Sequence, residues 1–223
     1  MTEFSQTTLT IGQNALNVNS PTRELAEFKG KIILLIGPSG AGKNTFLRRL
    51  VSEIPDIEYG ISTTSREPET RNGHIEMDRV HYYFDPKMFE DKSQFIEINC
   101  YSGNYYGVTI NEIKRVFSNH HHFISDIDVN GAKNFLIHPE FGERVHAIFI
   151  DLGSVEVMRK RILDRKPDIN PLDLQNRLGE YENERNQIDW FDVVIKNDID
   201  GDLETPYQAI KKEVEKFLAN LPK

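Results

Sequence analysis

A glycine-rich stretch between an apolar run and a helical pattern is the first part of the chain that suggests chemistry. Its residues are Gly37, Pro38, Ser39, Gly40, Ala41, Gly42 and Lys43. Glycines at this spacing let successive backbone N–H groups converge on phosphate oxygens, and the helix that follows adds the positive end of its dipole. A lysine at the last position reaches the terminal phosphates. The stretch therefore predicts a phosphate-binding loop that holds ATP.

The residue after the lysine departs from the usual pattern of such loops. A serine or threonine normally stands there, and its hydroxyl ligates Mg²⁺. This chain has Asn44 instead, followed by Thr45. An amide oxygen can still face a metal, directly or through water, because Mg²⁺ often keeps several of its waters in proteins. We expect both residues to belong to the ATP site, with Asn44 taking part in an altered but working Mg²⁺ site.

The elements around the loop predict the fold class. Lys31–Ile36 (KIILLI) is almost entirely apolar, as is typical of a strand buried on both faces, and helical spacing follows the loop until Pro55. Further strands are expected at 57–62, 80–84, 95–101, 123–128, 144–150 and 191–195, helices near 86–92, 109–118, 131–136, 154–165, 172–187 and 204–218, and a turn at 103–107. Strands that alternate with helices predict an α/β fold with a parallel sheet covered on both faces.

Composition narrows the class of protein. Of the 223 residues, 38% are apolar and 28% are charged, as in a globular domain with inserted parts. The longest apolar run is far shorter than the roughly 20 residues of a membrane helix. The formal net charge of −8 argues against a nucleic-acid polymer as the main ligand, because such proteins usually present a basic face.

Two further expectations concern location and organisation. Cys100 is the only cysteine and is expected in the core, so an internal disulfide is excluded and a reducing, cytoplasmic location is expected. Residues 1–30 are polar and are expected to form an extension outside the core. The sequence leaves open whether the protein forms a homo-oligomer.

Four blocks of the chain, taken in order, resemble the guanylate kinase family. They are the phosphate loop, Ser62–Arg66 (STTSR), Phe95–Glu97 with Ser102–Gly107 (SGNYYG), and Ser125–Gly131 (SDIDVNG). The resemblance runs from about Lys31 to the C-terminus. It implies a P-loop parallel-sheet core of three layers at 31–61, 109–160 and 188–223, an inserted small mixed α+β GMP-binding subdomain at 62–108, and a helical lid at 161–187.

The resemblance implies an enzyme that phosphorylates GMP or dGMP with ATP and Mg²⁺, with a role for each matching residue. Ser62 and Glu97 would face the guanine, whose N1–H and N2–H donors suit a carboxylate. The GMP phosphate would be held by Arg66, Tyr82 and Tyr106. The remaining matches are Asp128 near GMP, Asp126 near the metal, Arg161, Arg165 and Arg177 as clamps on the transferring phosphoryl group, and Asn197 near the adenine.

Two positions depart from the family pattern. The family has a second phosphate-binding arginine where this chain has Glu69, in a loop longer by a few residues. Arg71 is expected to replace that arginine, with Arg79 as the weaker candidate. The residue two past Tyr106 is usually a serine or threonine that helps to bind the base. Here it is Val108, whose side chain cannot form a hydrogen bond.

These departures leave two alternatives open. One is a related kinase with a different acceptor, such as another nucleotide or a ribose bisphosphate. The other is a guanylate-kinase-like module that binds proteins without catalysis. Such modules tend to lose the phosphate loop and the basic residues, which this chain keeps.

Overall fold

The core of the protein is a five-stranded parallel sheet. The computed structural model describes residues 28–67, 70–71, 74–75, 81–83, 85–101 and 103–220. The strand order is β11-β10-β1-β9-β2, with β1 Ile32–Ile36, β2 Ile57–Tyr59, β9 His122–Ile127, β10 Val145–Asp151 and β11 Val193–Lys196. Every residue of β1 is 0% exposed, because this strand has a neighbour on each side and helices on both faces. The loop after β1 therefore starts from the middle of the sheet, at the carboxyl end where parallel sheets bind ligands.

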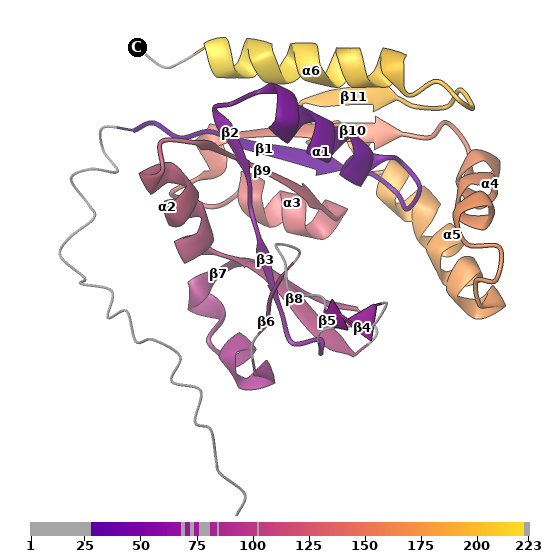
Figure 1. The fold of residues 1–223 in the computed structure, drawn as a ribbon, viewed down its shortest axis with the longest axis horizontal. Coiled ribbons are helices and arrows are strands. Elements are labelled where there is room, and N and C mark those ends of the chain that lie inside the picture. Colours follow the sequence, from indigo (N-terminus) through magenta and orange to yellow (C-terminus); the bar gives the residue numbers. More distant parts are fainter. Residues whose placement is uncertain are drawn as a thin grey trace, which may run out of the picture.

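In the described part of the chain, six α-helices accompany this sheet. They are α1 Lys43–Glu53, α2 Ile110–Ser118, α3 Val129–Leu136, α4 Val155–Arg165, α5 Pro171–Arg185 and α6 Glu204–Ala219. Helices α1 and α6 cover the face that carries Ile33 and Leu35, and α2 and α3 cover the opposite face. Helices α4 and α5 lie at the end of the sheet toward which the strand arrows point (Figure 1). The result is the three-layer α/β fold expected from the alternation of strands and helices.

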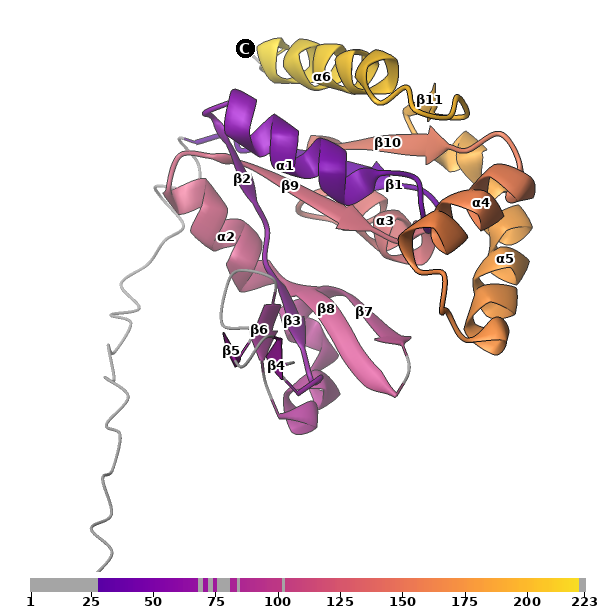
Figure 2. The same cartoon turned by 45° about the vertical axis from the view of Figure 1, so that its right-hand side comes forward.

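A second, mixed sheet lies beside the core. Its order is β6-β3-β8-β7, with β3 Ser62–Thr64, β6 His81–Tyr83, β7 Phe95–Tyr101 and β8 Asn104–Thr109. The short strands β4 (Thr70–Arg71) and β5 (His74–Ile75) form a separate antiparallel pair. The 3₁₀ segments are η1 Pro86–Glu90, η2 Lys92–Gln94, η3 Gly142–Arg144 and η4 Ile188–Trp190. Figure 2 shows this second sheet below the core, on the side where the connection between α4 and α5 also lies.

Four local expectations were wrong. The strand expected at 57–62 is two strands, because the chain leaves the core sheet after β2 and enters the second sheet at β3. Residues 104–107 are part of β8 rather than a turn, because the two tyrosines pair with β7, Tyr105 opposite Cys100 and Tyr106 opposite Asn99. Cys100 is exposed, since β7 is the edge strand of the small sheet and not part of the core sheet. The helix expected near 86–92 is two 3₁₀ segments, because Asp91 accepts a hydrogen bond from the Ser93 N–H and starts a new turn.

The ranges outside the description include the N-terminal extension, so the expectation for residues 1–30 falls mostly outside the described part of the chain. Among the helices of the described ranges, none combines the length and the apolar character needed to cross a membrane.

Candidate active site

The phosphate loop depends on glycine at several positions. Gly37, Gly40 and Gly42 have φ angles of 144°, 86° and 86°, a region that side-chain-bearing residues rarely adopt. At Gly37 a Cβ atom would also lie 2.5 Å from the carbonyl oxygen of Ile150 on β10. Gly42 is the N-cap of α1, so the positive end of that helix points into the loop. The backbone thus forms a curved loop whose N–H groups can converge on an anion.

Lys43 lies at the start of α1 with its ammonium group over the loop. Its Nζ donates to the carbonyl oxygens of Gly37 at 2.5 Å and Pro38 at 3.2 Å. Burial lowers the pKa of this amine, and the carboxylates of Asp126, Glu184 and Asp128 oppose that effect. The loop itself therefore holds the lysine where terminal phosphates would lie.

A cavity of about 290 Å³ opens above the lysine. It is lined by Gly37, Ser39, Lys43, Asp126, Ile127, Asp128, Met158, Arg177, Glu180 and Glu184. Six of the residues expected in the site from the sequence meet here, namely Gly37, Ser39, Lys43, Asp126, Asp128 and Arg177. The two aspartates were expected on one strand, but β9 ends at Ile127 and Asp128 is the N-cap of α3, where it accepts the N–H groups of Asn130 and Gly131. Both still face the same cavity.

Glu180 and Glu184 are site residues that the sequence reasoning missed. They lie three and seven positions after Arg177 on α5, so the three side chains share one helix face. That spacing was a usable signal. Burial raises the pKa of the Glu184 carboxyl to about 7, Lys43 lowers it, and Glu180 and Asp128 raise it further. The cavity therefore contains a carboxyl group that titrates near neutral pH.

Two of the three arginines contact the loop. Arg177 donates to the Ser39 hydroxyl at 2.9 Å. Arg161 donates to the Gly40 carbonyl at 3.5 Å and to Asn197 Oδ1 at 3.2 Å. Arg165 is exposed at the end of α4, and its charge lowers the pKa of Lys43. Positive charge is thus supplied by a helix pair that lies outside the sheet.

Asn197 lies between the phosphate loop and α4, and its expected place near the adenine stays a prediction. It is 2% exposed, accepts a hydrogen bond from Arg161, and donates through Nδ2 to the Ala41 carbonyl at 3.1 Å. The side chain therefore connects the phosphate loop to α4. In this structure it braces the loop.

The metal-binding residues expected from the sequence are Asp126 and Asn44. Asp126 lines the cavity and accepts a hydrogen bond from the Tyr59 hydroxyl at 3.3 Å. Asn44 and Thr45 lie in the first turn of α1 and are exposed, outside the residues that line the cavity. Over the described residues, no three His, Cys, Asp or Glu side chains group as a metal site. One carboxylate beside a phosphate loop fits Mg²⁺, which binds through one or two carboxylates, substrate phosphates and water.

On the acceptor side, Glu97 of β7 is a buried carboxyl group, 8% exposed. Its Oε1 accepts the Val108 N–H at 3.0 Å. Burial, and then the charge of Asp128, raise the pKa of Glu97 to about 8. Val108 is 2% exposed, and its side chain packs in the core on the side of α2 and α3. The valine therefore serves this site through its backbone, by holding Glu97.

The other expected acceptor residues come from the second sheet. Ser62 and Tyr106 lie on β3 and β8, where Tyr106 pairs with Thr64, and Arg66 follows β3 with its N–H on the Thr64 hydroxyl. Tyr82 of β6 donates its hydroxyl hydrogen to Glu112 Oε2 at 3.3 Å. The backbone of Arg71 lies in β4. The Arg71 side chain, Glu69 and Arg79 lie outside the described part of the chain.

Asp128 connects the two sides. It lines the phosphate-loop cavity, and its Oδ2 accepts a hydrogen bond from Asn99 Nδ2 of β7 at 2.6 Å. Asn99 lies two residues after Glu97 on the same strand. The cavity at the phosphate loop and the buried carboxyl of the second sheet are therefore neighbours.

A phosphate loop after the central strand of a parallel sheet, with a lysine and arginines around one cavity, defines a P-loop protein that binds nucleoside phosphates. The model of the guanylate kinase family matches residues 29–217, and the chain belongs to that family. The similarity covers both sheets and the helix pair α4–α5.

Known relatives agree with this assignment. The chain is 37% identical over 175 residues to a guanylate kinase of Chlorobium chlorochromatii, covering 77% of this chain and 88% of that one. It is 33% identical over 196 residues to a guanylate kinase of Porphyromonas gingivalis, covering 85% and 98%. A crystal structure of guanylate kinase from Anaplasma phagocytophilum has the same fold, with a TM-score of 0.61, 24% identity, and coverage of 84% and 85%.

Proposed function

We propose that this member of the family transfers the terminal phosphoryl group of ATP to GMP or dGMP, giving the diphosphate. The observation that carries the proposal is the position of Asp128. It faces the phosphate-loop cavity and also binds Asn99 on the strand of Glu97. A nucleotide on the loop and a purine monophosphate on the second sheet would therefore meet at one point.

On the donor side, the chain supplies positioning and positive charge. The loop N–H groups and the N-terminus of α1 bind the ATP phosphates. Lys43, Arg161, Arg165 and Arg177 neutralise the charge that spreads over the phosphoryl oxygens during transfer. Because Arg161 and Arg177 come from α4 and α5, movement of that helix pair toward the second sheet would complete the site and exclude water.

Magnesium belongs to the same proposal. When bound, it supplies neutralisation of charge across the β- and γ-phosphates. Asp126 and Asn44 would hold it, partly through water. Asp126 is suited to this role because its carboxylate faces the cavity within reach of the charge of Lys43.

On the acceptor side, Glu97 would accept both guanine donors, N1–H and N2–H, with Ser62 beside it. Two parallel hydrogen bonds to an ionised carboxylate are strong and selective. Arg66, Arg71, Tyr82 and Tyr106 would hold the phosphate. Since Val108 is buried, its side chain does not face the base, and the departure at this position is no argument against guanine. Small nucleotides as partners and a cytoplasmic location complete the proposal.

A coupled assay of ADP release tests it. ATP is offered with GMP, dGMP, AMP, CMP, UMP and ribose phosphates as acceptors. We expect kcat/KM for GMP and dGMP to be at least about a hundredfold above kcat/KM for the other acceptors. A site built around hydrogen bonds rejects bases that leave its polar groups unpaired. Failure of GMP while another acceptor turns over would overturn the proposal.

A further inference from the structure

The core and the second sheet are joined by two chain connections that lie close to one side chain. The first runs from β2 to β3 through Ile61, and the second from β8 to α2 through Thr109. Glu112, in the first turn of α2, accepts the Ile61 N–H on Oε1 at 2.9 Å, and its own N–H donates to the Thr109 hydroxyl at 3.1 Å. Figure 2 shows α2 next to the point where β2 passes into β3. Glu112 therefore ties together the two places about which the second sheet could turn.

The carboxylate of Glu112 is buried and fully engaged. The residue is 3% exposed, and Arg115 donates to its two oxygens at 2.8 and 2.9 Å. Arg115 also pairs with Glu58 of β2 at 2.6 Å. A buried charge is tolerated when it is paired and hydrogen-bonded in this way. Its fixed position makes Glu112 a rigid point between the core and the second sheet.

The remaining hydrogen bond of the Glu112 carboxylate is with Tyr82, a residue of the proposed acceptor site. Tyr82, 36% exposed, donates its hydroxyl hydrogen to Glu112 Oε2 at 3.3 Å, which is long for an O–H···O bond. A tyrosine hydroxyl has one hydrogen to donate, and neither a carboxylate nor a phosphate dianion has one to offer. Tyr82 therefore cannot donate to Glu112 and to an acceptor phosphate at the same time.

We propose that Glu112 is a positioning residue. It holds the Tyr82 hydroxyl next to the two connections between the core and the second sheet until the acceptor phosphate takes that hydrogen bond. Binding of the phosphate then breaks the Tyr82–Glu112 hydrogen bond and leaves Glu112 with Ile61 and Arg115. The inference rests on the proposed role of Tyr82 in binding the GMP phosphate. Its measurable consequence is that the Tyr82–Glu112 bond weakens binding of the phosphate group and has no effect on binding of the base.

A double-mutant cycle tests this with Glu112→Gln, Tyr82→Phe and the double variant. KM for GMP and for ATP is measured together with the dissociation constant of guanosine, which lacks the phosphate. Glu112→Gln is expected to lower KM for GMP about three- to fivefold, because a neutral acceptor competes less well for the hydroxyl. KM for ATP and guanosine binding should stay within twofold. In the Tyr82→Phe background the same substitution should leave KM for GMP unchanged.

A purely structural role predicts a different pattern. KM for GMP would rise or the effects of the two substitutions would be additive, and either result overturns the inference. Glu58→Gln is the matched control, since it removes the other partner of Arg115 and leaves the Tyr82–Glu112 bond in place. If Glu112→Gln does not fold, Glu112→Asp keeps the charge for Arg115 but is one carbon too short to hold Tyr82, and the same fall in KM is expected. Absence of GMP turnover in the unmodified protein would reject the proposed function itself, which separates the two failures.

Discussion

The phosphate loop and the acceptor side on the second sheet differ in how their residues are brought together. The loop is a single stretch of chain between β1 and α1, and its own backbone at three glycines shapes it. The acceptor side takes its residues from separate strands, with Glu97 on β7, Tyr82 on β6 and Asp128 at the start of α3. Local backbone geometry positions the residues of the phosphate loop, whereas tertiary packing positions the residues of the acceptor side. Substitutions on the two sides should therefore fail in different ways.

Lys43→Ala should have the largest effect and should be confined to the donor side. Loss of the ammonium that neutralises the transferring phosphoryl group is expected to reduce kcat by about 10³-fold. GMP binding should be nearly unchanged, since the lysine contacts the loop carbonyls and not the second sheet. Steady-state kinetics and calorimetric titration with GMP measure the two quantities. Equal losses in both would mean that the two sides are not separable.

Glu97→Gln should affect the acceptor side alone. The amide can still accept the Val108 N–H, but it cannot accept both guanine donors, so KM for GMP should rise roughly a hundredfold with KM for ATP unchanged. The raised pKa of Glu97, about 8, adds a pH dependence. Guanine binding needs the ionised carboxylate, so affinity should increase as pH rises from 6 to 8, by up to about tenfold per pH unit.

Guanosine is the ligand for this pH measurement, because a phosphate group titrates near pH 6 and would confuse the result. Fluorescence or calorimetric titration at several pH values gives the profile. A flat profile for the unmodified protein, or a profile that persists in Glu97→Gln, would contradict the assignment.

Much of the phosphate loop, and less of the acceptor side, could be predicted from the sequence. The reason is that the loop is one stretch of chain, whereas the acceptor side is assembled from separate strands. Glycines, Lys43 and the strand before them are adjacent in the chain, so local rules were sufficient. The positions of Val108 and Asn197 depend on which face of a strand or loop turns inward, and their side chains proved to be buried supports. Glu112 matters because of what α2 packs against, which no local pattern contains, whereas the spacing of Glu184 from Arg177 on α5 was a signal that the sequence did contain.

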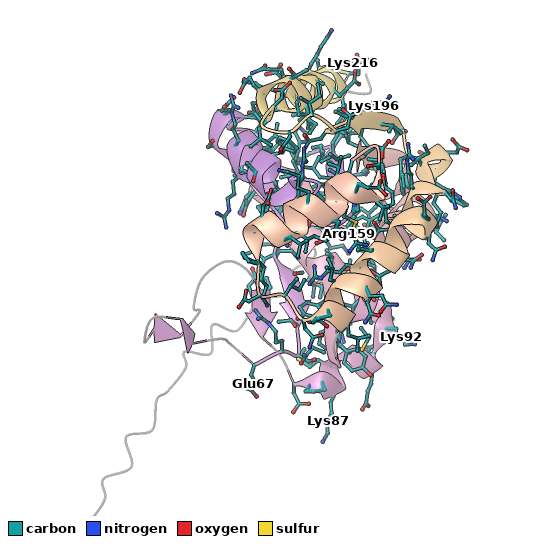
Figure 3. The ribbon with its side chains drawn as sticks, turned by 90° about the vertical axis from the view of Figure 1, so that its right-hand side faces the viewer. Glu67, Lys87, Lys92, Arg159, Lys196 and Lys216 are labelled. Atoms are coloured by element: carbon teal, nitrogen blue, oxygen red, sulfur yellow. The ribbon has the colours of Figure 1, made fainter. Side chains whose placement is uncertain are left out.

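Arg161→Ala compares the bracing of the loop with its charge. The side chain binds Gly40 and Asn197, so its loss should lower kcat about tenfold by removing a cation and loosening the loop. Arg159 on the same helix is exposed and is labelled in Figure 3, which makes Arg159→Ala the matched control. The control should retain full activity in the coupled assay. A similar loss in both variants would indicate a general effect of helix α4 charge.

Glu184→Gln tests whether a carboxyl in the loop cavity costs stability at neutral pH. The pKa of about 7 lies above the ordinary 4.5, so between these values the folded protein holds a proton that the unfolded chain has released. Stability contributed by this group is complete below pH 4.5 and is lost as pH rises through 7. Between pH 5 and pH 8, the free energy of unfolding of the glutamine variant should therefore increase by on the order of 2–3 kcal/mol relative to that of the unmodified protein. Urea unfolding at the two pH values measures this, and a constant difference would contradict it.

The smallest expected effect is that of Asn44→Ser, which restores the hydroxyl usual at this position. Asn44 is exposed in the first turn of α1, whereas Asp126 lines the cavity, so most of the metal binding would come from Asp126, the nucleotide phosphates and water. The serine should lower the Mg²⁺ concentration needed for half-maximal activity by about twofold, since a direct ligand replaces a water-bridged one. Thr45→Ser, one residue further along α1, is the control and should leave the Mg²⁺ dependence unchanged. An unchanged dependence in Asn44→Ser would show that the metal is bound without residue 44, and the unusual residue would then be a neutral feature of the loop.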